Sequence, residues 1–120
     1  MTLKKQIGDR GEALAADYLA ENGYAVLEKN LSCRYGEIDI VAGRGEHLFF
    51  VEIRYRSDLS FGTALESVTP AKQKKIRAAA TYWLNQRPDW RERVPFFSVL
   101  ALDEEPNGQV NIEFLPDAFV

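Results

Sequence analysis

The sequence has very few of the residues that form covalent cross-links and common catalytic centres. A single cysteine, Cys33, excludes an internal disulfide and is expected to be a small buried hydrophobe. The one histidine, His47, is expected at the end of a strand, without a partner that would make it a catalytic base. No zinc-ligand spacing, glycine-rich phosphate loop, or serine or cysteine nucleophile motif occurs. Any chemistry is therefore expected to come from carboxylates and cations.

Long hydrophobic runs are also absent. No apolar stretch approaches the roughly 18 residues of a membrane span, and the first thirty residues lack the apolar segment of a signal peptide. The composition is typical of a globular protein, with 46% hydrophobic and 28% charged residues in 120. We therefore expect a single cytoplasmic domain over residues 1–120, with no membrane partner and no need of a metal or disulfide to fold.

The chain is slightly acidic overall, but its positive charge is concentrated in one segment. The net charge is −3, yet residues 69–93 hold seven Lys or Arg against two acids, and residues 94–120 hold five acids and no base. Such a distribution creates either a local positive field or a solvated helix face. Charge alone favours the second interpretation.

The spacing of apolar residues predicts two helices and five strands in an α/β domain. Asn22-Gly23 is expected to end the first helix, and Thr69-Pro70 to begin the second. Residues 57–68 are expected to form a loop. The predicted order is helix 3–22, strands 24–30, 36–42 and 47–56, helix 70–87, and strands 95–102 and 109–115.

Strand 47–56 carries a carboxylate in the most apolar segment of the chain. Alternation places Leu48, Phe50, Glu52, Arg54 and Arg56 on one face. In the preceding strand, a two-residue turn at 44–45 would set Asp39 diagonal to Glu52, and a four-residue loop at 44–47 would set the two directly opposite. Both registers bring the two carboxylates to one face, whereas a three-residue loop would separate them.

Two converging carboxylates indicate a compensating cation. Oxygen ligands suit Mg²⁺, which is commonly held by one or two carboxylates together with water and phosphate oxygens. Arg54 would direct a second cation at the same place. The alternative is a solvated strand face on which Glu52 pairs with Arg54 or Arg56, and an isolated E-x-R tripeptide favours this alternative.

The second predicted helix begins with polar residues on its apolar stripe. Ile76, Ala79, Ala80, Trp83 and Leu84 form the stripe, and one turn earlier it contains Lys72 and Gln73. Gln73 could orient a water or a ligand, and Lys72 could meet a phosphate or extend to solvent. Glu12 borders the apolar stripe of the first helix, where a surface glutamate is equally compatible with the pattern.

Several blocks in order resemble a known family. "GDRGEALAADYLAENGY", "GEIDIVA", "LFFVEIRYR", "FGTALESVTPAKQKKI" and the final "LPDAF" resemble the YraN-like bacterial proteins over essentially the whole chain. That family is assigned to the PD-(D/E)xK nuclease superfamily and is similar to archaeal Holliday-junction resolvases. The resemblance implies a restriction-endonuclease-like core with a mixed central β-sheet flanked by helices.

The resemblance also implies roles for individual residues. Asp39, Glu52 and the Ile53 carbonyl would bind Mg²⁺ or Mn²⁺, with Glu12 assisting the site and Gln73 matching the glutamine of the following helix. Arg54 stands at the lysine position of the E-x-K tripeptide and keeps its charge, but it cannot release a proton. Ser98 stands where the family has an aspartate.

Three functional hypotheses follow. The first is a metal-dependent endonuclease acting on DNA, including branched or structured forms; the second is a nucleic-acid-binding module of the same fold without cleavage; the third is a protein-interaction domain. Related resolvases pair to cut two strands, so a homodimer is compatible with the first. The predicted nucleic-acid contacts are Arg56, Lys72, Lys74, Lys75 and Arg77.

Overall fold

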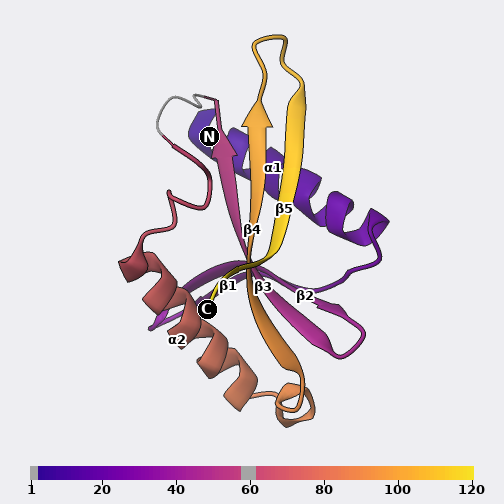
Figure 1. The fold of residues 1–120 in the computed structure, drawn as a ribbon, viewed down its shortest axis with the longest axis vertical. Coiled ribbons are helices and arrows are strands. Elements are labelled where there is room, and N and C mark those ends of the chain that lie inside the picture. The colour runs from indigo at the N-terminus through magenta and orange to yellow at the C-terminus, as the bar shows by residue number, and fades with distance from the viewer. Residues whose placement is uncertain (1–2, 58–61) are drawn as a thin grey trace.

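The computed structural model of the chain describes residues 3–57 and 62–120, with side chains described from Arg10 onward (Figure 1). The fold is mixed α/β, and its elements follow the predicted order, which is confirmed. A 3₁₀ turn, Pro88–Trp90, follows the second helix. The elements are α1 (Leu3–Glu21), β1 (Ala25–Cys33), β2 (Gly36–Arg44), β3 (His47–Arg56), α2 (Pro70–Asn85), β4 (Val94–Glu104) and β5 (Val110–Phe119).

The five strands form one sheet in the order β1-β2-β3-β4-β5. The β1–β2, β2–β3 and β4–β5 pairs are antiparallel, whereas β3 and β4 are parallel. A parallel pair needs a crossover, and α2 provides it. The mixed sheet implied by the family resemblance is therefore confirmed, with β3 at its centre.

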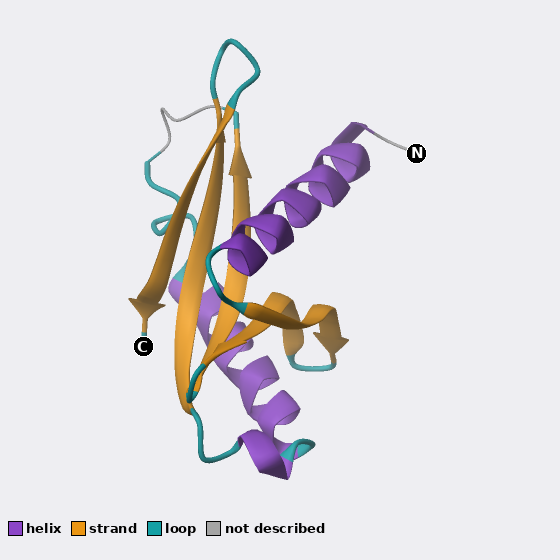
Figure 2. Ribbon diagram, turned by 90° about the vertical axis from the view of Figure 1, so that its right-hand side faces the viewer, coloured by secondary structure: helices purple, strands orange, loops and turns teal. Residues whose placement is uncertain are grey.

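The two helices cover opposite faces of this sheet (Figures 1 and 2). On the α2 side, Phe50 packs with Ile76 and Trp83. On the α1 side, Leu19 and Val51 belong to the second core cluster. Alternate residues of β3 therefore point into two separate cores, as predicted, and Glu52 interrupts the row that faces α2.

Helix α2 is fixed at both ends. Thr69 caps it by accepting a hydrogen bond from the Lys72 N–H at 3.2 Å, and Pro70 occupies the first turn. Near the other end, the Trp83 indole Nε1 donates to Glu28 Oε2 of β1 at 2.5 Å. Arg87 lies 4.4 Å above the Trp83 ring and 3.5 Å from the same carboxylate oxygen. The contacts of Trp83 and Arg87 with Glu28 hold this end of α2 against β1.

The β2–β3 turn differs from both predicted forms. Arg44 pairs with His47, so the turn consists of Gly45 and Glu46. Gly45 has φ = +59°, a left-handed conformation that suits glycine at a tight turn. The resulting register is the one predicted from the longer loop, although the turn itself has two residues.

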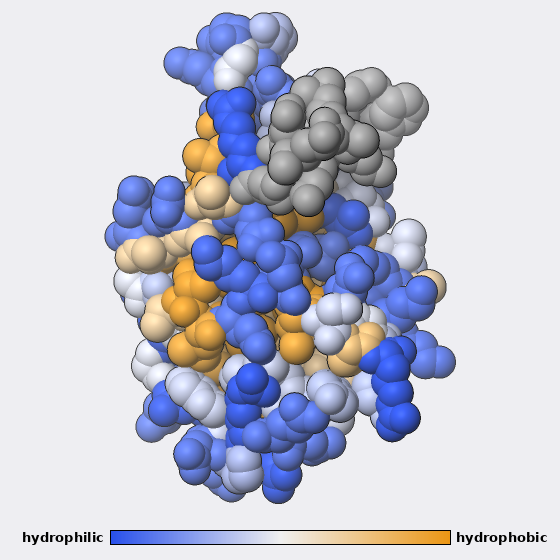
Figure 3. All heavy atoms as spheres, turned by 180° about the vertical axis from the view of Figure 1, so that it is seen from behind, coloured by the Kyte–Doolittle hydropathy of each residue, from blue (hydrophilic) through white to orange (hydrophobic). Residues whose placement is uncertain are grey.

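Among the described residues, no helix is long and apolar enough to cross a bilayer. Seen from the side opposite to Figure 1, the surface is mostly hydrophilic, with hydrophobic side chains in patches between polar ones (Figure 3). Of the predicted loop 57–68, residues 58–61 lie outside the described residues, and Thr63–Ser67 form a hydrogen-bonded turn.

Helix α2 approaches the start of β2 very closely at Gly36. A Cβ at this position would lie 3.0 Å from the backbone oxygen of Lys75 and 3.2 Å from the Lys75 Cβ. Backbone atoms in the middle of a helix cannot move aside without shifting the helix. Gly36 therefore sets the distance between α2 and β2, and with it the position of Lys72 and Lys75 over the sheet.

Replacing Gly36 by alanine should force α2 away from β2. We expect Gly36→Ala to lower the free energy of unfolding by about 1–3 kcal/mol, the usual cost of overpacking. Gly45→Ala is the matched control, because Gly45 has positive φ but no atom within 4 Å of a built Cβ. Urea denaturation measures both, and an equal or smaller loss in Gly36→Ala would contradict the close-packing role.

Candidate metal and phosphate site

Strands β2 and β3 separate in the middle of the sheet. Their pairing runs from Arg44↔His47 to Ile40↔Val51. Beyond Val51, β3 keeps its pairing with β4 on the other edge but is no longer paired with β2. The Ile53 N–H, on the side that β2 has left, donates instead to Asp39 Oδ2 at 2.8 Å. The side chain of Asp39 therefore replaces a backbone partner at the point where the two strands diverge.

Asp39 also lies at an irregularity of β2. Ile38 and Val41 both belong to the core under α2, although strict alternation would put residues three apart on opposite faces. The β1–β2 register passes over the Asn30–Asp39 position, and Asn30 has φ = +54°, which Asn tolerates better than most residues. This break, rather than simple alternation, directs the Asp39 carboxylate toward the end of β3.

Glu52 is the buried carboxylate of the site. It is 6% exposed, and two cations approach the same oxygen: Arg54 Nη2 is 3.5 Å and Lys72 Nζ is 3.8 Å from Glu52 Oε1. Lys72 comes from the first turns of α2, so that helix and β3 meet at this carboxylate. The ion pair predicted between Glu52 and Arg54 is present, but on a buried rather than a solvated face.

Both carboxyl groups are poorly solvated. Desolvation, followed by repulsion from Asp39, raises the pKa of Glu52 from 4.5 to about 7, although Lys72 and Arg54 act in the opposite direction. Desolvation likewise raises the pKa of Asp39, against the lowering effects of the Ile53 N–H and of the same two cations. The two acids therefore share one electrostatic environment, in which the protein's own cations do not fully compensate for burial.

The oxygen atoms at this point suit a hard divalent cation. Residues in a strand direct their N–H and C=O to the same edge, so the Ile53 carbonyl faces the gap beside Asp39. Among the described residues, no group of three His, Cys, Asp or Glu side chains is arranged to hold a metal. Two carboxylates and a carbonyl are the oxygen groups here that could hold Mg²⁺ or Mn²⁺, with water or phosphate oxygens completing the shell.

Two adjoining cavities border the site. The acidic cleft, of about 150 Å³, is lined by residues of β1 and β2 that include Asn30, Glu37 and Asp39. The basic groove, of about 330 Å³, shares Ser32 and Glu37 with the cleft and extends to α2. Its polar lining residues are Ser32, Arg34, Tyr35, Glu37, Lys72 and Lys75. Lys72 both lines this groove and contacts Glu52, so the groove leads to the carboxylates.

Comparisons with known proteins assign the family. The model of the uncharacterised protein family UPF0102 matches residues 11–102. The chain belongs to this family. A UPF0102 protein of Rhodococcus opacus is 42% identical over 113 residues, covering 94% of this chain and 95% of the relative. Another from Dictyoglomus turgidum is 38% identical over 116 residues, covering 96% and 98%. A third, from Moorella thermoacetica, is 48% identical over 84 residues, or 70% of each chain.

In this UPF0102 chain, two of the residues proposed from the sequence take part in other contacts. The Gln73 amide Nε2 donates to the Val68 carbonyl at 3.1 Å and so stabilises the start of α2. Glu12 Oε1 accepts from Asn30 Nδ2 at 2.8 Å. Glu12 still acts on the site at a distance, because its charge makes a small contribution to the raised pKa of Asp39.

The predicted basic patch divides into two parts. Lys72 and Lys75 line the basic groove, and Lys74 is exposed on the same helix. Arg77 instead donates to the Val120 carbonyl at 2.9 Å. Arg56 also makes other contacts, described below, and neither Arg56 nor Arg77 lines the basic groove. Their placement therefore does not support the prediction that they contact phosphates.

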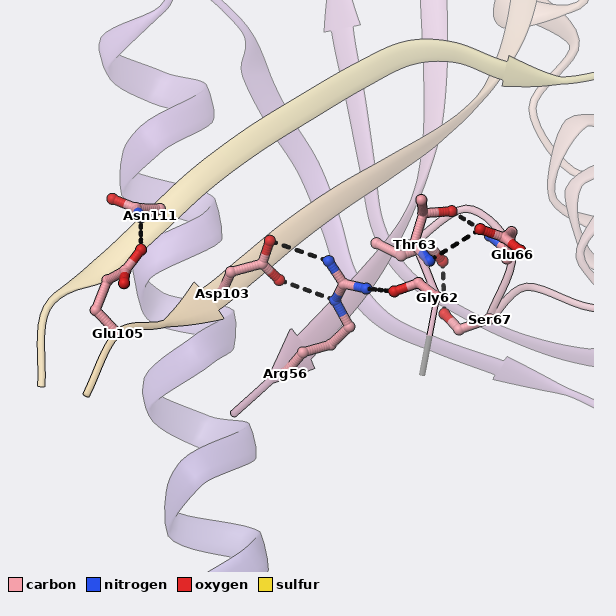
Figure 4. A network of polar contacts seen from close by, with 9 residues as sticks. Arg56, Gly62, Thr63, Glu66, Ser67, Asp103, Glu105 and Asn111 are labelled. Carbon is pink, nitrogen blue, oxygen red and sulfur yellow. Dashed lines mark hydrogen bonds and ion pairs between the residues drawn. The ribbon is translucent and has the colours of Figure 1, made fainter. Parts of the chain in front are cut away.

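Arg56 joins three segments of the chain (Figure 4). Its Nε and Nη2 donate to the two carboxylate oxygens of Asp103 at 2.9 and 3.0 Å, and its Nη1 donates to the Gly62 carbonyl at 2.5 Å. A bidentate arginine–carboxylate pair is strongly directional. Arg56 therefore ties the end of β3 to β4 and to the segment leading into α2.

Two further residues were missed in the sequence. Asn30 donates a hydrogen bond to Glu12 and lies opposite the irregularity of β2. The only signal in the sequence was that Asn tolerates a positive φ better than most residues. Glu37 lines both cavities, and its charge also raises the pKa of Glu52; its place two residues before Asp39 was the signal. Ser98 was noted as a departure from the family, and its hydroxyl donates to the Pro116 carbonyl at 2.6 Å, which satisfies this buried group.

The raised pKa of Glu52 predicts an unusual pH dependence of stability. Between pH 4.5 and about 7 the folded protein binds more protons at Glu52 than the unfolded chain, so this group lowers stability as pH rises. We expect the metal-free protein to lose on the order of 3 kcal/mol across this window relative to Glu52→Gln. The raised pKa of Asp39 acts in the same direction.

Urea denaturation of both proteins in chelator, at a series of pH values, measures this difference. Glu46→Gln is the control, since Glu46 is exposed at the β2–β3 turn, and its curve should run parallel to that of the unsubstituted protein. A wild-type minus Glu52→Gln difference that stays constant with pH would show that Glu52 titrates normally.

Proposed function

We propose that this UPF0102 protein is a metal-dependent endonuclease that hydrolyses phosphodiester bonds in DNA, including branched or structured forms. The observation that carries the proposal is the pair of the half-buried Asp39 and the buried Glu52, placed where β2 and β3 separate, with Arg54 and Lys72 both close to Glu52. Acids with raised pKa values in one environment are typical of functional sites. Replacing buried ionic groups by well-packed apolar residues is often neutral or stabilising, so folding alone gives little reason to keep this pair.

Asp39, Glu52 and the Ile53 carbonyl are the residues that would hold Mg²⁺ or Mn²⁺. When bound, such an ion polarises a phosphate oxygen and orients a water molecule for attack on phosphorus. Glu52 has a pKa of about 7 in the protein alone, so it exchanges a proton with solvent near neutral pH. Cation binding must displace that proton and is therefore expected to strengthen as pH rises.

Arg54 and Lys72 would neutralise the phosphate. The Arg54 side chain is 28% exposed, and its buried Nε has no hydrogen-bond partner within the described part of the chain. An unsatisfied guanidinium N–H beside a carboxylate site is suited to a phosphate oxygen, which would supply the missing acceptor. Lys72 and Lys75 would contact neighbouring backbone phosphates along the basic groove.

A second function, nucleic-acid binding without cleavage, is favoured by one observation. Arg54 and Lys72 both lie at ion-pair distance from Glu52 Oε1, and arginine is a larger group than the lysine of the E-x-K pattern. If these ion pairs persist in the complex, the basic groove would still bind phosphates, but the carboxylate would not be available to a divalent ion.

Cleavage assays distinguish the two functions. Supercoiled, linear and four-way-junction DNA would be incubated with the protein in Mg²⁺, in Mn²⁺ and in chelator. We expect metal-dependent cleavage that falls roughly 100-fold or more in Glu52→Gln and in Asp39→Asn, because each removes a ligand charge. Glu46→Gln, which changes an exposed carboxylate away from the site, should cleave normally.

The other outcomes are equally informative. DNA binding that survives Glu52→Gln, without cleavage in either metal, would favour the binding module and overturn the nuclease. An absence of binding even at low salt would overturn both and leave the protein-interaction domain.

Arg54→Lys tests how the site uses its arginine. We expect cleavage equal to or faster than that of the natural protein, because lysine keeps the charge and restores the family pattern in less space. Reaction rates at saturating Mg²⁺ measure the effect, with Arg54→Gln as the variant that removes the charge. A large fall in Arg54→Lys would mean that the planar guanidinium has a role of its own in this chain.

A further inference from the structure

The turn between β1 and β2 carries an exposed stack of aromatic and cationic groups. Tyr35 is 42% exposed, the Arg34 guanidinium carbon lies 4.8 Å above its ring centre, and Arg34 Nη2 donates to Tyr35 Oη at 2.7 Å. Tyr82 of α2 supports the Tyr35 ring from another side, with ring centres 5.8 Å apart and planes inclined by 52°. We call Tyr82, Tyr35 and Arg34 the aromatic stack.

Turn geometry does not account for these residues. Cys33 pairs with Gly36, so Arg34 and Tyr35 form a two-residue hairpin turn. Neither residue has a positive φ, so the turn accepts most residue types and does not itself require an aromatic or cationic side chain here. A large aromatic ring at this place contributes little to either core, since much of it remains in water. The stack is therefore better explained by a ligand than by folding.

The position of the stack indicates which ligand. Arg34 and Tyr35 line the same basic groove as Lys72 and Lys75, and Lys72 lies 3.8 Å from Glu52. A nucleic-acid backbone that neutralises the two lysines would thus pass beside the stack on its way to the carboxylates. Tyrosine rings and arginine planes stack on bases of any sequence, provided that the base is not already stacked in a duplex.

We propose that the aromatic stack binds an unpaired base, so that the preferred substrate is DNA with a single-stranded segment. This inference rests on the proposed function for its choice of ligand. It adds a specificity element that the two carboxylates do not provide, because the carboxylates act on a phosphate that every DNA form contains. Continuous duplex would bind through the lysines alone.

Binding measurements in chelator test this without interference from cleavage. Fluorescence anisotropy would compare a single-stranded oligonucleotide with its blunt duplex. We expect Tyr35→Ala to weaken single-strand binding by about 5- to 150-fold, the usual range for loss of one stacked base, and to leave duplex binding nearly unchanged. Arg34→Ala should weaken single-strand binding in the same selective way.

Two matched controls separate stacking from charge and from folding. Tyr35→Phe keeps the ring and removes only the hydroxyl to which Arg34 donates, so it should retain most of the single-strand binding that Tyr35→Ala loses. Lys75→Gln should weaken single-strand and duplex binding alike and reduce their salt dependence, as expected for a phosphate contact. Equal losses on both DNA forms in Tyr35→Ala, or no loss on single strands, would overturn the proposal.

The same preparations, assayed for cleavage in Mg²⁺, separate this proposal from the nuclease. Tyr35-dependent single-strand binding without Glu52-dependent cleavage would support the stack and overturn the nuclease. Glu52-dependent cleavage, with Tyr35→Ala binding single strands as well as the natural protein does, would support the nuclease and overturn the stack.

Discussion

The hydrogen bond from the Ile53 N–H to Asp39 Oδ2 is the contact on which the site depends. Where two strands of a sheet separate, backbone groups lose their partners, and an unpaired buried N–H is costly. Asp39 supplies the missing acceptor from a side chain, which allows β2 to leave β3 without that cost. The same bond fixes the Asp39 carboxylate next to Glu52. The contact that satisfies the Ile53 N–H therefore also brings the two acids together.

The pocket is not optimised for stability. Two acids are held in poorly solvated positions, and Arg54 and Lys72 balance them only in part, as the pKa of Glu52 near 7 indicates. Sites that sacrifice folding stability in this way are commonly sites of function. Elsewhere the chain satisfies its buried polar groups well: Ser98 bonds to a carbonyl and Trp83 bonds to a carboxylate.

The sequence was sufficient to predict the element order and the face of Glu52, because helical and strand periods are strong signals and β3 is buried on both sides. It left the β2–β3 register open, since the choice depends on one left-handed glycine, Gly45. It could not reveal the irregularity at Asp39, which involves a second strand. The partners of Arg56 and Arg77 were also inaccessible, because both are brought close by segments far along the chain.

The anchoring of α2 has an evolutionary consequence. The hydrogen bond between Trp83 and Glu28 fixes one end of this helix. Lys72, about three turns away, lines the basic groove and also contacts the buried Glu52. Because α2 moves as a rigid helix, a shift that improved the position of Lys72 would also disturb the contact between Trp83 and Glu28. Variation among relatives at the Gly36 contact should therefore be accompanied by compensating changes at both ends of the helix.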